Sequence, residues 1–317
     1  MYKFVLKRIV MLIPVIIGVT FVVFFILSVA PGDPVLTILG DGATDEAIEQ
    51  MREELGLNDP LLVRYVNYIW DVLHGDFGLS YKTRLPVSDQ LLARFPNTIL
   101  LASCGIVLAI AFGIPLGILS VKKQYTFLDN VATVGALVSV SMPKFWLGLL
   151  LVLIFSLNLG VFPSQGMGEG VVGTLHSLVL PAVTLSTGFM ATIMRMTRSS
   201  MLETIRQDYI STARAKGIKE SQVTIRHMLK NALIPVIPLC GLQFGQMLGG
   251  SMITETVFSW PGVGRYVLDS IKTKDTPAIL GCVILMSVSF SVINLLVDIL
   301  YGYVDPRIKS QYKAGKI

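Results

Sequence analysis

Charged residues are scarce in this chain: Asp, Glu, Lys and Arg make up 15% of its 317 residues, against about 25% in soluble domains. Hydrophobic residues make up 53%, and the mean hydropathy is +0.68. These values exclude an ordinary water-soluble enzyme. Six apolar runs of membrane-spanning length recur along the chain. They predict an all-α, polytopic membrane protein.

Cysteine and histidine are also rare, with three of each. Cys104, Cys240 and Cys282 lie far apart inside apolar runs and lack a CxxC spacing, so we interpret them as packing residues. The histidines are scattered in predicted loops, and we expect neither a metal nor a cofactor in this chain. The phosphate-loop pattern G-x-x-x-x-G-K-S/T is missing, since Gly315-Lys316 lacks the first glycine and the hydroxyl residue. The chain is therefore predicted not to be an enzyme.

The apolar runs cover residues 9–30, 97–121, 130–159, 177–194, 231–254 and 276–297. The first run is longer than the apolar core of a signal peptide, and Pro31 would follow a cleavage after Ala30, so we predict a retained span. The third run is interrupted by Pro143-Lys144 and could be two short spans. At about 1.5 Å per residue, its roughly 28 residues form a helix of about 42 Å, which can cross once while tilted or kinked. Residues 1–317 are then one transmembrane domain of six helices.

The loops differ in charge, which predicts their orientation. Residues 31–96 hold eleven acidic and five basic residues and are expected outside. Residues 195–230 hold eight basic and three acidic residues and are expected in the cytoplasm by the positive-inside rule. The basic C-terminal tail agrees, so both termini are predicted to be cytoplasmic. The net charge of +5 is thus distributed by loop rather than on one face, and we predict no nucleic-acid partner.

The external segment, residues 31–96, is patterned rather than disordered. Asp59-Pro60 is a typical helix start, with an acidic N-cap and proline at the first helical position. Apolar residues then repeat at helical spacing: Leu61, Tyr65, Ile69 and Leu73. A shorter helix is expected over residues 45–55. These helices either lie over the outer end of the bundle or form a platform for an external partner.

The internal loop, residues 198–231, is predicted to contain a helix over residues 203–215, a turn at Gly217 and a second helix from about Ser221. Gly217 can adopt a positive φ and end the first helix, whose last turn carries Arg214 and Lys216. The loop could present a solvated basic face or contact anionic lipid. Its compact shape favours protrusion into a soluble partner.

At this loop the sequence resembles the membrane subunits of ATP-binding cassette (ABC) importers, whose EAA-xxx-G loop docks into the ATPase. Ser211-Thr212-Ala213 and Gly217 fit the spacing, although Ser211 replaces the glutamate and the expected proline appears later, at Pro235. The chain looks like the dipeptide and oligopeptide branch from end to end. The segments that carry this resemblance are Ala30-Pro31-Gly32-Asp33-Pro34; Gly75-Asp76-Phe77-Gly78; Phe95-Pro96-Asn97-Thr98; Ser141-Met142-Pro143; Asp208-Tyr209 with Ala213 to Gly217; Glu255 to Gly264; and Asp305-Pro306-Arg307.

The resemblance implies a type I importer fold in a bacterial or archaeal cytoplasmic membrane. The long segment after the first span points to the first of two paired permeases. The implied partners are a second homologous permease, two cytoplasmic ATPases that bind ATP and Mg, an external binding protein, membrane lipid and a peptide substrate. Nickel complexes or glutathione are alternative cargoes.

The resemblance also directs attention to two groups of residues. We expect the contact with the ATPase at Ala213, Arg214, Ala215, Lys216, Gly217 and Ile218, where small residues permit close approach, the basic residues can pair with acids and Ile218 can fill a groove. The alternative is that Ala213 and Gly217 pack the loop on its own spans. An external gate is expected at Trp260, Pro261, Gly262, Val263 and Gly264, with Trp260 at a membrane interface; the alternative is a tight re-entry turn.

Polar residues at membrane depth are few, so each is a candidate for the transport pathway. These are Lys144, Asn294 and Asp298. Equally, Lys144 and Asp298 could reach the interface by snorkelling. Glycines at 241, 245 and 249, and at 113 and 117, are spaced for close helix packing.

Two other classes of protein are less favoured. A proton-coupled secondary transporter needs carboxylates or histidines deep in the membrane, and only Asp298 comes close. An intramembrane hydrolase needs a nucleophile with a positioned base or metal ligands such as H-E-x-x-H, and neither pattern is visible.

Overall fold

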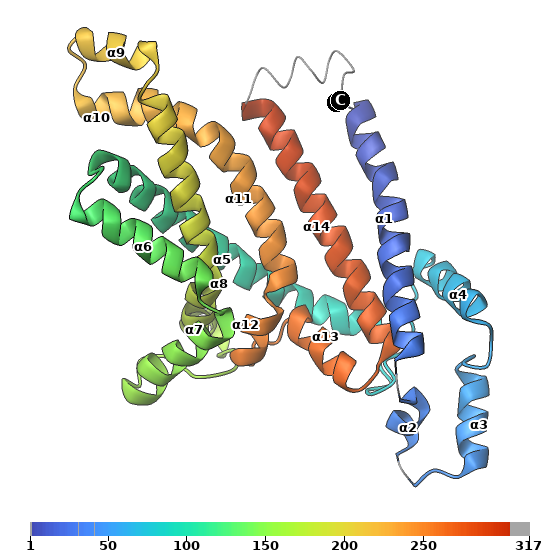
Figure 1. The fold of residues 1–317 in the computed structure, drawn as a ribbon. Coiled ribbons are helices and arrows are strands. Elements are labelled where there is room, and N and C mark those ends of the chain that lie inside the picture. The colour runs from blue at the N-terminus through green and yellow to red at the C-terminus, as the bar shows by residue number, and fades with distance from the viewer. Residues whose placement is uncertain (1, 31, 41, 305–317) are drawn as a thin grey trace.

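The computed structural model describes residues 2–30, 32–40 and 42–304, which are almost entirely helical (Figure 1). Within these ranges the strand-like pairing is a single bridge between Leu79 and Pro86. The α-helices are α1 (Tyr2–Val29), α2 (Pro34–Leu39), α3 (Asp45–Glu54), α4 (Leu61–Leu73), α5 (Val87–Lys122), α6 (Phe127–Ser141), α7 (Lys144–Leu151), α8 (Gly170–Thr204), α9 (Asp208–Ala215), α10 (Glu220–Gln222), α11 (Lys230–Gly250), α12 (Met252–Val257), α13 (Val263–Lys272) and α14 (Thr276–Val304). Two π-helical segments, η1 (Val152–Asn158) and η2 (Val223–Leu229), continue α7 and α10.

The predicted spans are confirmed as helices. Five helices are long and apolar enough to cross a membrane, namely α1, α5, α8, α11 and α14, and the bent pair of α6 with α7 and η1 brings the number to six. Their boundaries differ from the apolar runs, since α5 begins ten residues before position 97, at Val87. Polar residues do not stop a helix where both ends project beyond the hydrocarbon, so hydropathy marks the membrane depth and not the helix ends.

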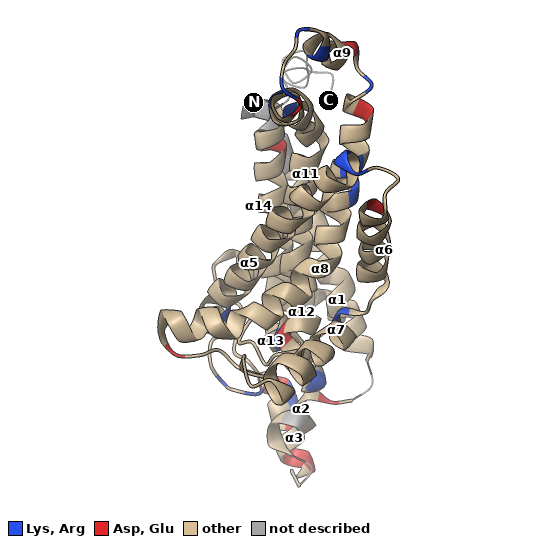
Figure 2. Ribbon diagram, turned by 90° about the vertical axis from the view of Figure 1, so that its left-hand side faces the viewer, with Lys and Arg blue, Asp and Glu red and all other residues tan. Residues whose placement is uncertain are grey.

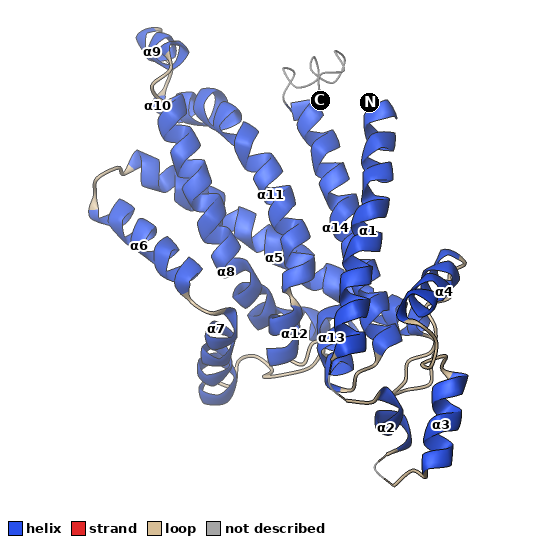
Figure 3. Cartoon of the chain, turned by 45° about the vertical axis from the view of Figure 1, so that its right-hand side comes forward, coloured by secondary structure: helices blue, strands red, loops and turns tan. Residues whose placement is uncertain are grey.

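The third apolar run is not the long, gently kinked helix of the prediction. Its second half, α7 with η1, is bent by 106° from the direction of α6. Pro143 starts the second half, and Met142 before it is extended, with φ −76° and ψ 123°. The proline ring disfavours a helical residue before it and removes an N–H donor, which ends α6. Figure 3 shows α7 turned away from α6.

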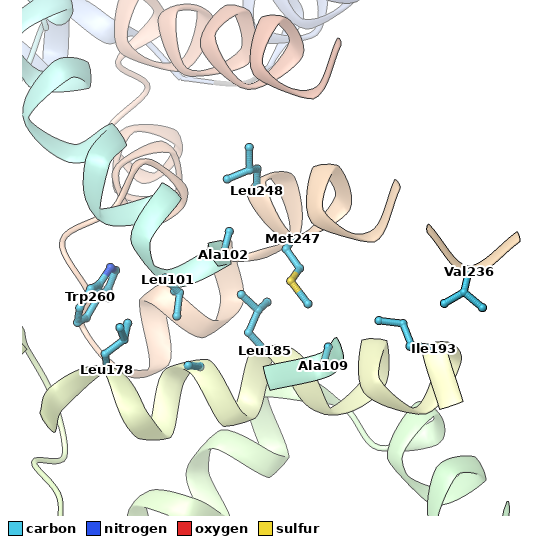
Figure 4. Packing of buried hydrophobic residues seen from close by; sticks show 11 residues of the cluster. Leu101, Ala102, Ala109, Leu178, Leu185, Ile193, Val236, Met247, Leu248 and Trp260 are labelled. Carbon is cyan, nitrogen blue, oxygen red and sulfur yellow. The ribbon is translucent and has the colours of Figure 1, made fainter. Parts of the chain in front are cut away.

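The core of the bundle is formed by α5, α8 and α11. Figure 4 shows their buried side chains, among them Leu101, Leu185, Ile193 and Met247. Between helices in lipid there is little hydrophobic driving force, so close packing must hold the bundle together. Gly113 and Gly117 bring α5 against α8: a Cβ on Gly113 would lie 2.8 Å from the Met190 carbonyl.

The predicted glycine stripe on α11 packs within the chain. A Cβ at Gly241 would overlap the Val297 side chain on α14, and one at Gly245 would lie 3.0 Å from Phe290. Gly249 has open space around it. Two of the three glycines therefore set the distance between α11 and α14.

The described chain has two distinct ends. The start of α1, the end of α14 and the α9 loop lie at one end, called here the termini end, and α2 and α3 lie at the other (Figure 1). Figure 2 shows charged residues gathered towards both ends and few along the middle of the spans. Residues 305–317, including the Asp305-Pro306-Arg307 motif and the basic tail, lie outside the described residues.

The segment between α1 and α5 contains the expected helices with two corrections. α3 covers Asp45–Glu54, with the Thr44 hydroxyl accepting from the Ala47 N–H at 3.3 Å. α4 starts at Leu61, so Pro60 is its N-cap and not its first helical residue. Leu73 is 75% exposed instead of facing the bundle. Pro60 takes φ −54° and ψ 139°, an extended conformation that ends the incoming turn.

Candidate functional site

The α9 loop makes a tight turn at the termini end. Helix α9 ends at Ala215, and Gly217 follows with φ 76°. The Gly217 N–H donates to the Arg214 carbonyl at 2.9 Å, and the Ile218 N–H donates to the Ala213 carbonyl at 3.3 Å. These two bonds form a Schellman motif, in which a left-handed residue closes a helix. The predicted stop at Gly217 is confirmed. Its missing Cβ faces open space, so the backbone conformation is what requires glycine.

The helix before this turn is shorter than predicted. α8 ends at Thr204, and α9 begins only at Asp208, after Gln207 in an extended conformation. A continuous helix over residues 203–215 is therefore wrong. The break lets α9 fold back so that Ile210 is fully buried, a tertiary contact that residue spacing does not reveal. The second helix starts at Glu220, one residue earlier than expected.

Two of the six residues expected to contact the ATPase face the chain's own spans. Ala213 is 6% exposed, and Ile218 is half-buried beside it, in a cluster with Met201, Val223 and Met228. Ile218, expected to fill a groove of the ATPase, packs partly against the chain's own spans, and its contact with an ATPase stays a prediction. These apolar residues pack the turn against α8, η2 and the end of α5.

The outward face of the turn consists of Arg214, Ala215, Lys216 and Gly217, which are exposed. Arg214 pairs with Glu220 across the turn, with Nε 3.1 Å from Oε2 and Nη2 2.7 Å from Oε1. The hydrogen bond to Glu220 raises the pKa of Arg214. We expected Arg214 to pair with an acid of a partner, whereas within this chain its acid is Glu220.

A buried ion pair next to this loop escaped the sequence analysis. Asp129, at the start of α6, is 3% exposed. Arg198 on α8 donates to it from Nη2 at 3.0 Å and from Nε at 3.1 Å. The Ser120 hydroxyl at the end of α5 also donates to Asp129. Three spans are thus joined near the termini end. An acid at the edge of an apolar run could have marked Asp129 as a candidate, but hydropathy alone does not identify Arg198 as its partner.

The predicted gate, residues 260–264, is buried and partly helical. Trp260 is fully buried and lies beside Leu101 and Leu178 (Figure 4). Its Nε1–H donates to the Asn97 carbonyl at 2.9 Å. The expected position of Trp260 at a membrane interface is therefore wrong. Val263 and Gly264 are the first residues of α13, so only the start of this segment is a turn.

Glu255 holds this segment in place, and the sequence analysis did not single it out. It is fully buried. It accepts from the Thr98 hydroxyl at 2.9 Å, from the Ser251 hydroxyl at 2.8 Å and from the Arg265 N–H at 2.9 Å. A Cβ at Gly262 would overlap its carboxylate. The carboxylate thus sits at the N-terminus of α13, where the helix dipole favours negative charge.

Thr98 links this network to α5. Its hydroxyl donates to Glu255 and accepts from the Val263 N–H at 2.9 Å. The neighbouring Asn97 side chain donates to the Pro261 carbonyl at 2.9 Å. The turn between α12 and α13 is therefore fixed to the second span. Glu255 was missed because it lies one residue beyond the apolar run that ends at Thr254.

The three pathway candidates do not form one site. Lys144 is half-buried at the start of α7, with its Nζ 4.5 Å from the centre of the Phe189 ring. Asn294 and Asp298 are half-buried on α14, one helical turn apart. The end of α14 lies at the termini end and α7 lies towards the opposite end (Figure 1). A pathway that includes all three would have to run most of the length of the bundle.

Comparison with known proteins places the chain in a family. Residues 113–310 match the family described as binding-protein-dependent transport system inner membrane component, and residues 1–102 match the N-terminal part of the same membrane component. The chain is 40% identical to the dipeptide transport system permease protein DppB of Escherichia coli, over 98% of this chain and 99% of that protein. It is 41% identical to the oligopeptide transport system permease protein AppB of Bacillus subtilis, over 98% and 100%. It is also 41% identical to the glutathione transport system permease protein GsiC of Salmonella choleraesuis, over 98% and 99%.

Solved structures share the fold at low sequence identity. The inward-facing MetNI methionine ABC transporter matches with a TM-score of 0.53 and 18% identity, over 68% of this chain and 96% of that chain. An amino acid ABC transporter crystallised with histidines matches with a TM-score of 0.51 and 16% identity, over 69% and 94%. The family matches over residues 1–102 and 113–310 and the 40% identity over nearly the full length show that the chain belongs to the inner membrane components of binding-protein-dependent transport systems, the permease subunits of ABC importers.

Proposed function

We propose that this chain is the first of two permeases that together form the pathway of an ATP-driven peptide importer. The observation that carries the proposal is its similarity along nearly the whole length to permeases of dipeptide, oligopeptide and glutathione systems. All three cargoes are peptides or built from amino acids. A dipeptide or short oligopeptide is therefore the cargo we propose, with glutathione as the alternative that the GsiC relative favours. Nickel complexes, the remaining alternative, have no support among these relatives.

The termini end faces the cytoplasm in this proposal, and residues 31–96 face outward. The eight basic residues within residues 195–230 support it, because cytoplasmic loops and the span ends next to them carry an excess of Lys and Arg. Two ATPase subunits then bind at the α9 turn, one beneath each permease. ATP and Mg are held by those subunits, and this chain, which lacks a phosphate-loop motif, does not supply the ATP hydrolysis.

The α9 turn is the coupling element in this proposal. When ATP closes the two ATPases, the turns of the two permeases are drawn together and the pathway opens outward. Ala213 and Ile218 bury the inner side of the turn, so a force on its exposed side reaches α8 and η2 directly. Arg214 and Glu220 stiffen the turn across Gly217. Ala215, Lys216 and Gly217 are left as the contact surface.

Residues 260–264 form the outer gate in this proposal. They lie at the opposite end from α9, and Glu255 and Thr98 hold them against α5. A binding protein that docks at this end would have to move α12 and α13 relative to α5 to admit the peptide. Lys144 and Asn294 with Asp298 are proposed as polar groups along the pathway, at its two ends.

The proposal is tested by purifying the tagged chain from membranes in mild detergent and identifying what co-purifies. A second permease and ATPase subunits are expected. ATPase activity of that complex, measured with binding protein and peptide, should fall in a Gly217→Asp variant, because the new side chain and charge stand on the contact surface. Gly160→Asp is the matched control, since Gly160 also has a positive φ, 63°, and open space around it. It lies after η1 and away from α9.

The two variants and the purification distinguish an importer from a transporter that works alone. Loss of coupling in Gly217→Asp but not in Gly160→Asp supports the importer and the α9 contact together. A chain that purifies alone and transports without ATP would refute the importer. A proton-coupled transporter would then be the better hypothesis, with Asp298 as the first residue to replace.

A further inference from the structure

Helix α4 carries three separate stripes along its length. Leu61, Tyr65 and Ile69 pack towards α1 and the start of α14. Polar side chains form the second stripe and line a cavity of about 200 Å³: Arg64, Asn67 and Asp71. Apolar side chains form the third, 61% to 75% exposed: Leu62, Val66, Trp70 and Leu73. With 3.6 residues per turn, these four lie within about 100° of the helix circumference. The third stripe contains no charged residue.

The contacts of Tyr65 fix the depth of α4. Its ring centre lies 5.2 Å from that of Phe21 and 5.5 Å from that of Phe24, and its hydroxyl donates to the Ile17 carbonyl at 2.7 Å. Phe24 and Phe21 precede Val29, the last residue of α1, by five and eight residues. At about 1.5 Å per residue they lie about 8 and 12 Å inside that end of the span. Helix α4 therefore packs on the side of α1 within its apolar part and not over its end.

The surface of α1 next to α4 is apolar and is largely uncovered by this chain. Only 11% of the apolar part of α1, Val10–Val29, is buried in the chain. Figures 1 and 3 both show α4 beside α1, and Tyr65 of α4 also packs with Leu280 at the start of α14. The exposed stripe of α4 continues this apolar surface at the same depth. Interfacial helices immerse their apolar face to a similar depth, about 5 to 10 Å.

We propose that α4 is an interfacial helix immersed in the outer part of the bilayer, with Leu62, Val66, Trp70 and Leu73 in contact with lipid acyl chains. Its polar stripe faces the chain's own cavity, so the helix does not bring charge into hydrocarbon. This replaces both interpretations made from the sequence, a cover over the end of the bundle and a platform for a soluble partner. Lipid acyl chains therefore cover the exposed apolar stripe of α4.

The test compares two variants that each carry a single spin label, one on the exposed apolar stripe of α4 and one on α3. Val66→Cys reports on the stripe, and Gln50→Cys, an exposed neutral residue on α3, is the matched control. Each labelled chain is studied in its purified complex in phosphatidylcholine nanodiscs, with the unsubstituted chain as background because it carries three cysteines. Leu73→Cys repeats the stripe measurement at a second position. The readout is the collision rate of the label with oxygen and with a polar nickel chelate.

Immersion predicts an oxygen-to-chelate collision ratio about tenfold higher at position 66 than at position 50, since polar solutes are excluded from hydrocarbon. Equal ratios would mean that water covers the stripe and would overturn the proposal. Poor access of both probes would mean that protein covers it, which also overturns it. Chelate access that disappears on adding the external binding protein would identify a soluble partner instead.

Discussion

Three carboxylates with almost no exposed surface each join parts of the chain that are far apart in sequence. Asp129 links α6 to Arg198 on α8, and Glu255 links α12 to Thr98 on α5. Asp275 caps α14 through the Ala278 N–H at 3.4 Å and accepts from the Tyr81 N–H at 3.0 Å. A buried carboxylate must find donors, because leaving it unpaired is strongly unfavourable. Each of these side chains therefore specifies one packing arrangement.

Replacing Asp129 with Ala should destabilise the chain by about 3 kcal/mol, because Arg198 would keep its charge in a mostly buried site without a partner. Thermal unfolding of the purified complex, followed by loss of monodisperse protein, measures the effect. Glu220→Ala is the matched control: it removes the carboxylate from an exposed bidentate arginine pair and should change stability by no more than about 1 kcal/mol. Similar losses from both substitutions would show that the burial of Asp129 is unimportant.

The pair of Asp33 and Arg52 predicts a pH dependence in the segment after α1. Burial opposes ionisation of Asp33, but the Arg52 guanidinium and the Val35 N–H outweigh it and lower the pKa of Asp33 below its ordinary 3.8. A carboxyl with a lowered pKa stabilises the folded state above its unfolded pKa, and this contribution is lost as the pH falls through the folded value. Hydrogen exchange of α2 and α3, corrected for intrinsic rates, should therefore accelerate as the pH is lowered below about 4.

Arg52→Gln should abolish most of this pH dependence, and Lys82→Gln, on an exposed residue of the same segment, should leave it unchanged. An unaltered pH profile in Arg52→Gln would show that another group titrates in this range.

At the scale of helices, glycine decides how closely pairs of spans approach. Gly113 and Gly117 do so between α5 and α8, and Gly241 and Gly245 do so between α11 and α14. In the membrane such small residues replace the hydrophobic effect as the reason for association, because they allow backbones to come close. The same helix α11 also offers an internal comparison, since Gly249 on the same face has open space.

Gly241→Ala should separate α11 from α14, because the new Cβ overlaps the Val297 side chain, and should destabilise the chain by about 1 to 3 kcal/mol. Gly249→Ala should instead be neutral or stabilise by up to about 1 kcal/mol, through helix propensity alone. Thermal unfolding of both variants decides the matter. Recovery of stability in the double variant Gly241→Ala with Val297→Ala would identify the clash as the cause, and a loss of similar size in Gly249→Ala would contradict it.

At the scale of the whole molecule, the chain has one end with the α9 turn and another with α2 and α3. If the termini end is cytoplasmic, a cysteine at Ala215 should react with a membrane-impermeant maleimide only in inside-out vesicles. A cysteine at Gln50 should react only in cells whose cytoplasmic membrane is intact and whose outer layers have been made permeable to the reagent. Both side chains are exposed in this chain, and the chain is expressed without the ATPases that would cover Ala215, so accessibility differs only by the side of the membrane. The reverse labelling pattern would contradict the orientation that the charges of the loops predict.

Much of this architecture could be predicted from residue patterns. The six runs, the glycine turn at Gly217 and the packing role of Gly241 follow from hydropathy, backbone freedom and spacing, which are local properties. Of the helices in the segment after α1, α3 and α4 were predicted for the same reason, and the short α2 was not. The family could also be predicted from short motifs that occur in the expected order along the chain, because each motif is contiguous in sequence.

Only the tertiary structure decided what those elements face. Trp260 is buried and not interfacial, Ile218 points inward, and Asp129, Arg198 and Glu255 are joined to partners on other helices. It also decided that the third run bends by 106° and that α4 lies beside α1. In each case the contact joins residues distant in sequence, and periodicity identifies a face of a helix but not its neighbour. Hydropathy and local backbone preference therefore determined which segments can span the membrane and where single turns occur, because these are properties of neighbouring residues. The packing of one span on another determined where the helices break and which side chains remain available to a partner.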